Sequence, residues 1–179
     1  PMASGFPSPI MEFSFLDEDG KPTPPGVAGE INVRSSAAIQ RYHTGSSEDF
    51  YEGWLATGDV GYINEEGLLF ICGRVKDMII RGGENIYPSE IEACLATLPL
   101  CLDAAVVGRP DPKWGEEVAA VVQVPPGTEA NSQLVIEHCQ QQLAAFKVPV
   151  QVIFTEKPLP RNALRKLLKN KISAEYYPQ

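Results

Sequence analysis

The chain has 179 residues, a formal net charge of −8 and 44% hydrophobic residues, which suits one large domain or two small ones. This composition excludes global disorder, and the acidic balance argues against a protein that binds nucleic acid or anionic membranes. No stretch reaches the roughly 20 apolar residues that span a bilayer, so no transmembrane segment is expected. The N-terminus PMASGFPSP lacks the basic start and apolar core of a signal peptide, which favours an intracellular, cytoplasmic protein.

The first 75 residues read as short strands and turns. MEFSF leads into the turn Asp17–Gly20, three prolines interrupt the chain, and GEINVR is a second strand. Residues 35–52 are polar and predict a surface loop. GWLATGDVGYI and GLLFICG are expected to pair around the turn 64–67. This pattern predicts a small β-barrel-like piece with few helices.

The pattern changes after Gly73. Residues 78–80 form a short apolar strand, and Pro88 opens a helix in which Ser89 and Glu92 have capping-box spacing. Its apolar residues fall at i, i+3, i+4 and i+7 and are Ile91, Cys94, Leu95 and Leu98. The runs DAAVVG and EVAAVVQV predict two strands, joined by a Pro-Asp-Pro loop around Trp114, which we expect to be a packed loop anchor.

The last third of the chain predicts two further helices. The first has Val135, Cys139 and Leu143 on one face, and the strand 151–155 follows it. The second has Leu164, Leu168 and Ile172 on one face, with basic residues on the other. The order from residue 75 is β-α-β-β-α-β-α. The fold class is therefore α+β: a β-barrel-like piece over 1–74, then a compact α/β domain over 75–179, with the boundary near 74–77.

The cysteines and histidines predict neither a metal site nor a catalytic triad. The cysteines form no CxxC pattern and have no nearby pair of histidines, so a zinc site is not expected; they are Cys72, Cys94, Cys101 and Cys139. A chain of this length needs no disulfides, so we expect buried free thiols in a reducing compartment. His43 and His138 are expected to be structural.

The average charge hides an asymmetry. Residues 1–75 contain 11 acidic and 4 basic side chains, whereas residues 76–179 contain 12 acidic and 11 basic ones. Five of those bases lie between Arg161 and Lys171 with no acid among them. From charge alone, the run favours a solvated helix face.

Four short motifs have residue types suited to chemistry. In Thr57-Gly58-Asp59, the carboxylate can accept two hydrogen bonds from vicinal ribose hydroxyls, although a plain Gly-Asp turn also fits. In Gly73–Asp77, the planar fork of Arg74 suits phosphate or hydroxyl pairs, and an ordinary charged linker is the alternative.

The other two motifs lie in the second half of the chain. In residues 81–87, paired glycines free the backbone for a thin ligand or a tight turn, and no Gly-Lys-Ser/Thr follows that would make a Walker motif. In residues 160–166, Lys166 near a helix start could neutralise a phosphate or a carboxylate, or could be an ordinary surface lysine.

Taken in order, these motifs resemble the adenylate-forming (AMP-binding) superfamily. The strings are GWLATGD, GRVKDMIIRGGENIYPSEIE, LAAFKVP and LPRNALRK, and their order and spacing agree across nearly the whole chain. The string GGENIYPSEIE resembles acyl-CoA synthetases most. Peptide-synthetase adenylation domains tend to have an Arg-Ile-Glu version of it.

The resemblance implies an ATP-dependent ligase. Such enzymes join a carboxylic acid to ATP, release pyrophosphate and form an acyl-adenylate, which a thiol such as CoA converts into a thioester and AMP. A small C-terminal domain rotates between a pose for each half-reaction. The implied partners are ATP, CoA and a carboxylic acid, and no nucleic acid is expected. The ligands for Mg²⁺ are expected outside this chain.

The resemblance also implies roles for particular residues. Asp59 and Arg74 match nucleotide-binding residues, Lys76 matches the hinge position, and Lys166 matches the lysine that stabilises charge during adenylation. The family's loop that lines the pantetheine path in the thioester-forming pose is matched by Gly82, Gly83, Glu84 and Asn85.

Two departures from the family pattern limit these expectations. The family commonly has Thr-Gly before its lysine, but this chain has Leu164-Arg165, and glycine takes φ > 0 more cheaply than arginine. The loop is therefore expected to enter its helix early and to move Lys166, whereas Asn162 in place of a frequent Thr is expected to be harmless.

The second departure is the absence of the phosphate loop, the acid pocket and the glutamate that organises Mg²⁺. The chain thus resembles the final third of such an enzyme, inactive alone: the end of the large domain, the hinge and the small domain. Two alternatives stay open, namely an adenylation domain that loads a carrier protein, and a non-catalytic module that binds a nucleotide or a partner.

Overall fold

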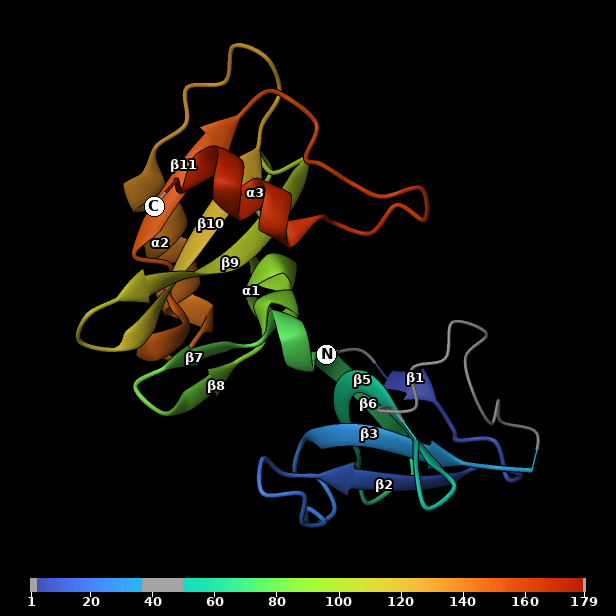
Figure 1. Cartoon of the computed structure of the whole chain (residues 1–179). Coiled ribbons are helices and arrows are strands. Elements are labelled where there is room, and N and C mark those ends of the chain that lie inside the picture. The colour runs from blue at the N-terminus through green and yellow to red at the C-terminus, as the bar shows by residue number, and fades with distance from the viewer. Residues whose placement is uncertain (1–2, 37–49, 179) are drawn as a thin grey trace. The chain divides into compact units, whose positions relative to one another are not determined.

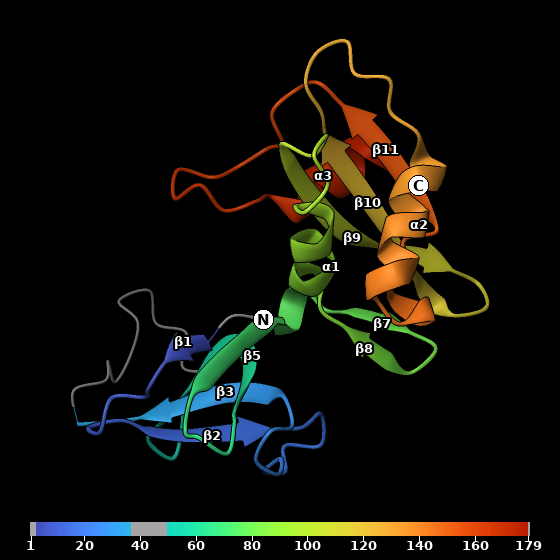
Figure 2. The ribbon, with the colours of Figure 1, turned by 180° about the vertical axis from the view of Figure 1, so that it is seen from behind.

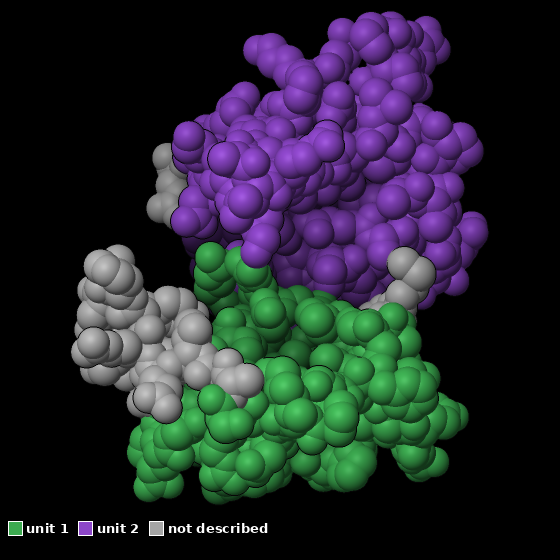
Figure 3. Space-filling view, turned by 90° about the vertical axis from the view of Figure 1, so that its right-hand side faces the viewer, with its two compact units in different colours: residues 1–76 green, residues 77–179 purple. Residues whose placement is uncertain are grey.

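The computed structural model describes residues 3–36 and 50–178 of the chain. The chain divides into two compact units, Pro1–Lys76 and Asp77–Gln179, which are coloured separately in Figure 3. No helix of the described residues is long and apolar enough to cross a membrane. His43 and most of the loop expected over residues 35–52 lie outside the described residues.

The first unit is an antiparallel sheet with strand order β1-β6-β5-β3-β2, and β4 pairs with β5 (Figure 1). The strands are β1 (Ala3–Gly5), β2 (Glu12–Leu16), β3 (Gly29–Arg34), β4 (Phe50–Tyr51), β5 (Trp54–Ile63) and β6 (Leu69–Arg74). Within the described residues β1 and β2 are the two ends of this order, so the sheet is open and no closed barrel forms. The β-barrel-like expectation is therefore not confirmed.

Side chains in two turns close the hairpins of this unit. Oδ1 of Asp17 accepts hydrogen bonds from the backbone N–H groups of Asp19 (3.0 Å) and Lys21 (2.8 Å). Oδ1 of Asn64 accepts one from the N–H of Leu68 (2.8 Å). Both turns fall where the sequence predicts them, because Asp and Asn stabilise turns through such bonds.

The second unit has a five-stranded sheet with β10 (Gly115–Gln123) at its centre. β10 pairs along its length with β9 (Asp103–Asp111), in parallel with β11 (Gln151–Thr155), and at Gly115 with β7 (Ile79–Arg81). β8 (Glu84–Ile86) extends the sheet beyond β7. The element order agrees with the predicted one except for β8, a strand that the sequence pattern does not indicate.

Helices cover both faces of this sheet. Figures 1 and 2 show α1 (Pro88–Leu95) and α2 (Ser132–Gln142) over one face and α3 (Lys169–Tyr176) over the other. Short 3₁₀ turns lie at Val75–Asp77 and Ala145–Lys147.

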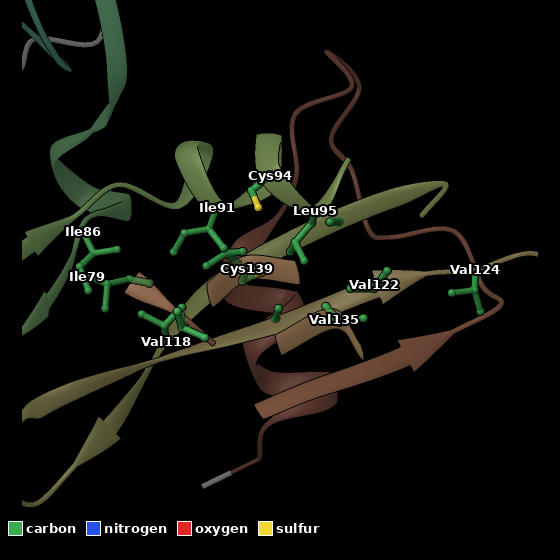
Figure 4. Packing of buried hydrophobic residues seen from close by; sticks show 14 residues of the cluster. Ile79, Ile86, Ile91, Cys94, Leu95, Val118, Val122, Val124, Val135 and Cys139 are labelled. Atoms are coloured by element: carbon green, nitrogen blue, oxygen red, sulfur yellow. The ribbon is translucent and has the colours of Figure 1, made fainter. Parts of the chain in front are cut away.

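Alternating strand residues separate two apolar clusters. Val106, Val118 and Val122 belong to the cluster on the face with α1 and α2. Figure 4 shows Val118 and Val122 among other buried residues of this cluster. Ala105, Val107, Ala119 and Val121 point to the opposite face and pack with Ile172. A strand turns successive side chains to opposite faces, so two buried faces produce the nearly continuous apolar runs of β9 and β10.

The predicted capping box of the first helix is wrong. Tyr87 is the N-cap and has no side-chain cap bond, because Pro88 already takes the first helical position and Ser89 lies inside the helix. Oε1 of Glu92 instead accepts a hydrogen bond from the backbone N–H of Val106 (2.9 Å). The predicted buried face holds within the helix, where Ile91, Cys94 and Leu95 are buried.

The predicted start of the last helix is also wrong. α3 begins at Lys169, not near Leu164, and residues 161 and 167 form an isolated bridge that closes a loop. Arg165 has φ of +63°, which a right-handed helix cannot include. The loop therefore does not enter its helix early.

Candidate functional site

The first candidate motif, Thr57–Asp59, is a bulge in a continuous strand, not a turn. Across β3 and β5, Asn32 faces Ala56 and Glu30 faces Val60, so β5 has extra residues between these pairs. Gly58 has φ of +71°, which glycine adopts readily. Oγ1 of Thr57 donates to the carbonyl of Ile31 (2.8 Å) and accepts from the N–H of Asp59 (3.1 Å). The threonine thus fixes the backbone that presents Asp59.

Asp59 and Arg74 lie together. They are Cα partners on the antiparallel strands β5 and β6, and Nε of Arg74 is 3.2 Å from Oδ1 of Asp59. Both side chains are about one-third exposed, at 36% for Arg74 and 35% for Asp59, so a ligand can reach them. The pair joins an acceptor for hydroxyl groups to a planar donor for anions at one place.

Lys76 follows this pair after one residue. It is exposed in the 3₁₀ turn Val75–Asp77. The boundary between the two compact units falls between Lys76 and Asp77. A backbone rotation here would move one unit without disturbing a sheet, because β6 ends at Arg74 and β7 begins at Ile79.

The Gly82-Gly83 motif is the tip of the β7–β8 hairpin. Both glycines have positive φ, +61° and +88°. The N–H of Gly82 donates to the carbonyl of Trp114 (2.8 Å), and a Cβ on Gly82 would lie 2.8 Å from Cε3 of Trp114. The backbone carbonyl and the ring of Trp114 thus both lie against this turn, but the side chain is 44% exposed and is not the packed anchor that the sequence predicts. Glu84 and Asn85 follow directly in β8, so the structure groups the four residues of this motif.

Two further contacts hold the hairpin. The guanidinium of Arg81 donates to the carbonyl of Phe146 (2.8 Å), and Oε2 of Glu116 accepts from the N–H of Ile80 (2.8 Å). Arg81 opens the predicted glycine motif but has no role of its own in it, and Glu116 lies outside every motif. No short pattern indicates them, because their partners are 65 and 36 residues away.

Lys166 lies in the loop between β11 and α3, which projects from the second unit (Figure 1). Oδ1 of Asn162 accepts hydrogen bonds from the backbone N–H groups of Leu164 (3.0 Å) and Lys166 (2.9 Å). The N–H of Asn162 donates to the carbonyl of Lys166 (2.9 Å). Asn162 thus organises the loop, a larger role than the sequence indicates. Asn favours such local bonds over a helix.

The side chain of Lys166 is available to a ligand. Lys166 is exposed and makes no side-chain hydrogen bond or ion pair with the part of the chain that the structure describes. Two other basic residues of the run form ion pairs: Arg161 pairs with Asp103 at 2.7 Å and Lys169 with Glu92 at 2.8 Å. The basic run is therefore not one solvated helix face.

The cysteines and His138 take structural positions. None of the four cysteines forms a disulfide, and burial raises the pKa of Cys139 to about 12, so this thiol stays protonated at neutral pH and is a poor nucleophile. Only Cys94 and Cys139 are fully buried, whereas Cys72 and Cys101 are half-buried. Nε2 of His138 lies 2.8 Å from Oγ1 of Thr97, a contact between α2 and the end of α1.

A metal site is not built by the residues in view. Over residues 3–36 and 50–178, no group of three or more His, Cys, Asp or Glu side chains could hold a metal ion.

Comparison with known proteins gives a consistent result. The family model described as the AMP-binding enzyme C-terminal domain matches residues 90–166. The chain is 42% identical over 151 residues to a long-chain-fatty-acid–CoA ligase of Mycobacterium tuberculosis, covering 83% of this chain and 30% of that protein. It is 36% identical over 178 residues to a fatty acid–[acyl-carrier-protein] ligase of Streptomyces coeruleorubidus, covering 98% of this chain and 34% of that protein.

A solved structure agrees in fold. The o-succinylbenzoate CoA synthetase of Bacillus subtilis, in complex with its acyl-adenylate intermediate, has a TM-score of 0.85 and 34% identity. The match covers 95% of this chain and 35% of that one. The same enzyme in complex with ATP and a magnesium ion gives a TM-score of 0.83 at 33% identity and covers 96% and 35%. The chain spans about a third of the length of the relatives it matches.

Proposed function

Because this chain belongs to the AMP-binding enzymes and contains their C-terminal domain, we propose that it is part of an ATP-dependent acid–thiol ligase. In the first half-reaction, a carboxylate oxygen of the acid attacks the α-phosphorus of ATP, and pyrophosphate leaves. In the second, the thiol of CoA attacks the acyl carbon, a thioester forms and AMP leaves. The observation that carries this proposal is the exposed Lys166 on a loop of fixed backbone.

Lys166 supports the adenylation step. That step brings a carboxylate to an already anionic phosphate, so the transition state needs compensating positive charge. An ammonium group held by an ordered loop supplies this charge before the reaction begins, an effect often worth about 3 kcal/mol. Arg165 adopts the left-handed backbone conformation that the family's glycine would adopt at this position, so the loop conformation is kept. This weakens the alternative of a non-catalytic module.

Asp59 and Arg74 support nucleotide binding. The accessible carboxylate of Asp59 can accept hydrogen bonds from both ribose hydroxyls, and Arg74 holds it in place at 3.2 Å. The Thr57 contacts fix the bulge, so little ordering is needed when the nucleotide binds.

The Gly82-Gly83 turn supports the thioester-forming step. Two residues without side chains at the hairpin tip leave room for a thin chain such as pantetheine, with Glu84 and Asn85 beside them. The same unit contains both Lys166 and this turn. Rotation of this unit at Lys76 would therefore remove Lys166 from the active site after adenylation and bring the glycine turn there for thioester formation.

The acid and the acceptor are part of the proposal. The relatives named for fatty acids favour a fatty or similar carboxylic acid, and the relative solved with ATP and a magnesium ion favours Mg²⁺ as a cofactor. We place the ligands of that ion outside this chain. The carrier-protein ligase of Streptomyces is the observation that keeps a second candidate, transfer to an acyl-carrier protein. Because ATP and CoA are intracellular reactants, the proposed location is intracellular.

The test uses the longer protein that contains this chain. Lys166→Ala is expected to lower ATP–pyrophosphate exchange by about 100-fold, while attack of CoA on supplied acyl-adenylate stays within about twofold. Lys171→Ala, which changes an exposed lysine outside the loop, is the matched control. An unchanged exchange rate in Lys166→Ala would favour the non-catalytic module.

Two simpler assays complete the test. The 179-residue chain alone, with ATP, CoA and mixed fatty acids, is expected to release no AMP, and robust turnover would overturn the proposal that the active site needs the rest of the enzyme. Product formation with CoA but not with acyl-carrier protein separates the two acceptors.

A further inference from the structure

The loop that presents Lys166 is attached to β9 at its beginning. Nη2 of Arg161 lies 2.7 Å from Oδ2 of Asp103, the first residue of β9. Nη1 of the same guanidinium donates to the carbonyl of Arg165. One side chain therefore connects the sheet directly to the residue that precedes Lys166.

The loop is attached again where it ends. Nζ of Lys169 lies 2.8 Å from Oε1 of Glu92 in α1, and it also donates to the carbonyl of Val106 in β9 (3.0 Å). The same carboxylate oxygen accepts from the N–H of Val106 (2.9 Å). Two side chains thus satisfy both backbone groups of Val106, which a neighbouring strand would otherwise pair.

The Lys169–Glu92 contact differs from an ordinary surface ion pair. Lys169 and Glu92 are only 17% and 21% exposed, and each also bonds to the backbone. A partly buried pair with several bonds is screened less by water and holds its geometry better than an exposed pair. The two pairs lie on either side of Lys166 in the chain, at residues 161 and 169.

We propose that Arg161–Asp103 and Lys169–Glu92 are positioning residues that hold the Lys166 loop in the conformation needed for adenylation. This inference rests on the proposed role of Lys166. The printed contacts of both pairs are with other residues of the second unit, and in this proposal neither pair touches the reacting atoms. Their effect is therefore confined to the half-reaction that uses Lys166, whereas residues that only stabilise the domain would affect both half-reactions alike.

The first experiment measures the loop itself and does not depend on activity. In Arg161→Gln, amide hydrogen exchange at Lys166 is expected to speed up by about 10-fold in the 179-residue chain. Exchange at Val121, a buried residue of β10, is expected to stay unchanged. Arg34→Gln breaks the exposed Arg34–Glu12 pair in the first unit and is the matched control. Unchanged exchange at Lys166 would overturn the proposal.

The second experiment separates the half-reactions in the longer protein. Arg161→Gln and Lys169→Gln are expected to lower ATP–pyrophosphate exchange by about 10- to 100-fold, the range for a small misplacement of a catalytic group. Thioester formation from supplied acyl-adenylate is expected to change less than about twofold. Arg161→Lys, which keeps the charge on a different donor geometry, should recover part of the loss.

The charge exchange gives the strongest control. The double variant Arg161→Asp with Asp103→Arg restores the pair, so it should regain part of the adenylation rate that either single variant loses. Equal losses in both half-reactions would assign these residues a structural role only and overturn the proposal. If instead Lys166→Ala itself leaves adenylation unchanged, the proposed function fails, whatever the amide hydrogen exchange of the loop shows.

Discussion

At the scale of single residues, the structure shows how a local cost is tolerated beside a functional side chain. Arg165 adopts φ of +63°, a conformation that costs a non-glycine residue about 1 kcal/mol or more. Its N–H donates to the carbonyl of Asn162 (2.9 Å), and its own carbonyl accepts from Arg161. These bonds define the turn and leave Lys166 at its exposed end.

Arg165→Gly is expected to stabilise the second unit. Glycine adopts this φ without strain but gains freedom in the unfolded chain, so the net increase in the free energy of unfolding is about 0.5 kcal/mol. Urea unfolding measures it. Arg165→Ala keeps the Cβ and its strain, so an equal gain in that variant would contradict the explanation.

Tyr177 provides a second residue-scale prediction. Its hydroxyl donates to the carbonyl of Ala120 (2.7 Å) in the interior of the second unit. Tyr177→Phe removes this bond and leaves the carbonyl without that donor, which should lower the free energy of unfolding by about 1–2 kcal/mol. Urea unfolding at neutral pH checks this value, and a change below experimental error would contradict it.

Burial also makes the second unit sensitive to alkaline pH. Burial raises the pKa of Tyr177 from 10.0 to about 12 and that of Cys139 from 9.0 to about 12. Both groups are acids that ionise more easily when unfolded, so their contribution is complete below about pH 9 and is lost as pH rises toward 12. Unfolding free energies measured from pH 8 upward should fall. Tyr177→Phe should flatten the part above pH 10, and an unchanged slope would exclude Tyr177 as a cause.

At the scale of elements, the β7–β8 hairpin depends on a contact far away in the chain. Gly82 lies against the ring of Trp114, whereas a Cβ on Gly83 would meet nothing within 4 Å. Both glycines have positive φ, so alanine is strained at either position. Only at Gly82 does it also collide with the indole ring.

Gly82→Ala is therefore expected to destabilise the second unit more than Gly83→Ala, by about 1 kcal/mol or more, because overpacking adds to the strain. Urea unfolding measures the difference, and Trp114 fluorescence should change in Gly82→Ala alone. The double variant with Trp114→Ala removes the collision, so its effect should be less than additive. Equal costs at both glycines would contradict the contact.

At the scale of the whole molecule, the two units differ in their interiors. The second unit has two clusters of buried side chains on opposite faces of its sheet. The buried apolar residues of the first unit are few among the described positions, Ile31, Val33 and Val60, and its exposed apolar residues include Phe6 and Tyr51. A one-layer sheet with so small a core has little apolar burial to offset its chain entropy.

The chain is therefore expected to unfold in two steps. Urea should unfold the first unit at a lower concentration than the second, and residues 77–179 expressed alone should fold cooperatively. Trp54 reports the first unit and Trp114 the second, so single-tryptophan variants separate the transitions. A single coincident transition for both probes would contradict this expectation.

The sequence by itself determined the features that depend on neighbours in the chain. Alternation and helical spacing located most strands and the buried faces of α1 and α2, and the motif order indicated the family before any fold was known. The Asp59–Arg74 and Gly82–Asn85 groups also needed only a hairpin each, because both are closed by adjacent strands.

Only the tertiary structure decided the features that depend on distant partners. Glu92 has the spacing of a helix cap, yet it binds Val106 and Lys169, which come from other elements. Arg161 and Lys169 look like members of one basic face, yet each is held by an acid far away, Asp103 being 58 residues from Arg161. A local pattern reports which conformations a segment prefers, but a buried or partly buried charge takes the partner that the fold brings to it, and that choice left Lys166 exposed.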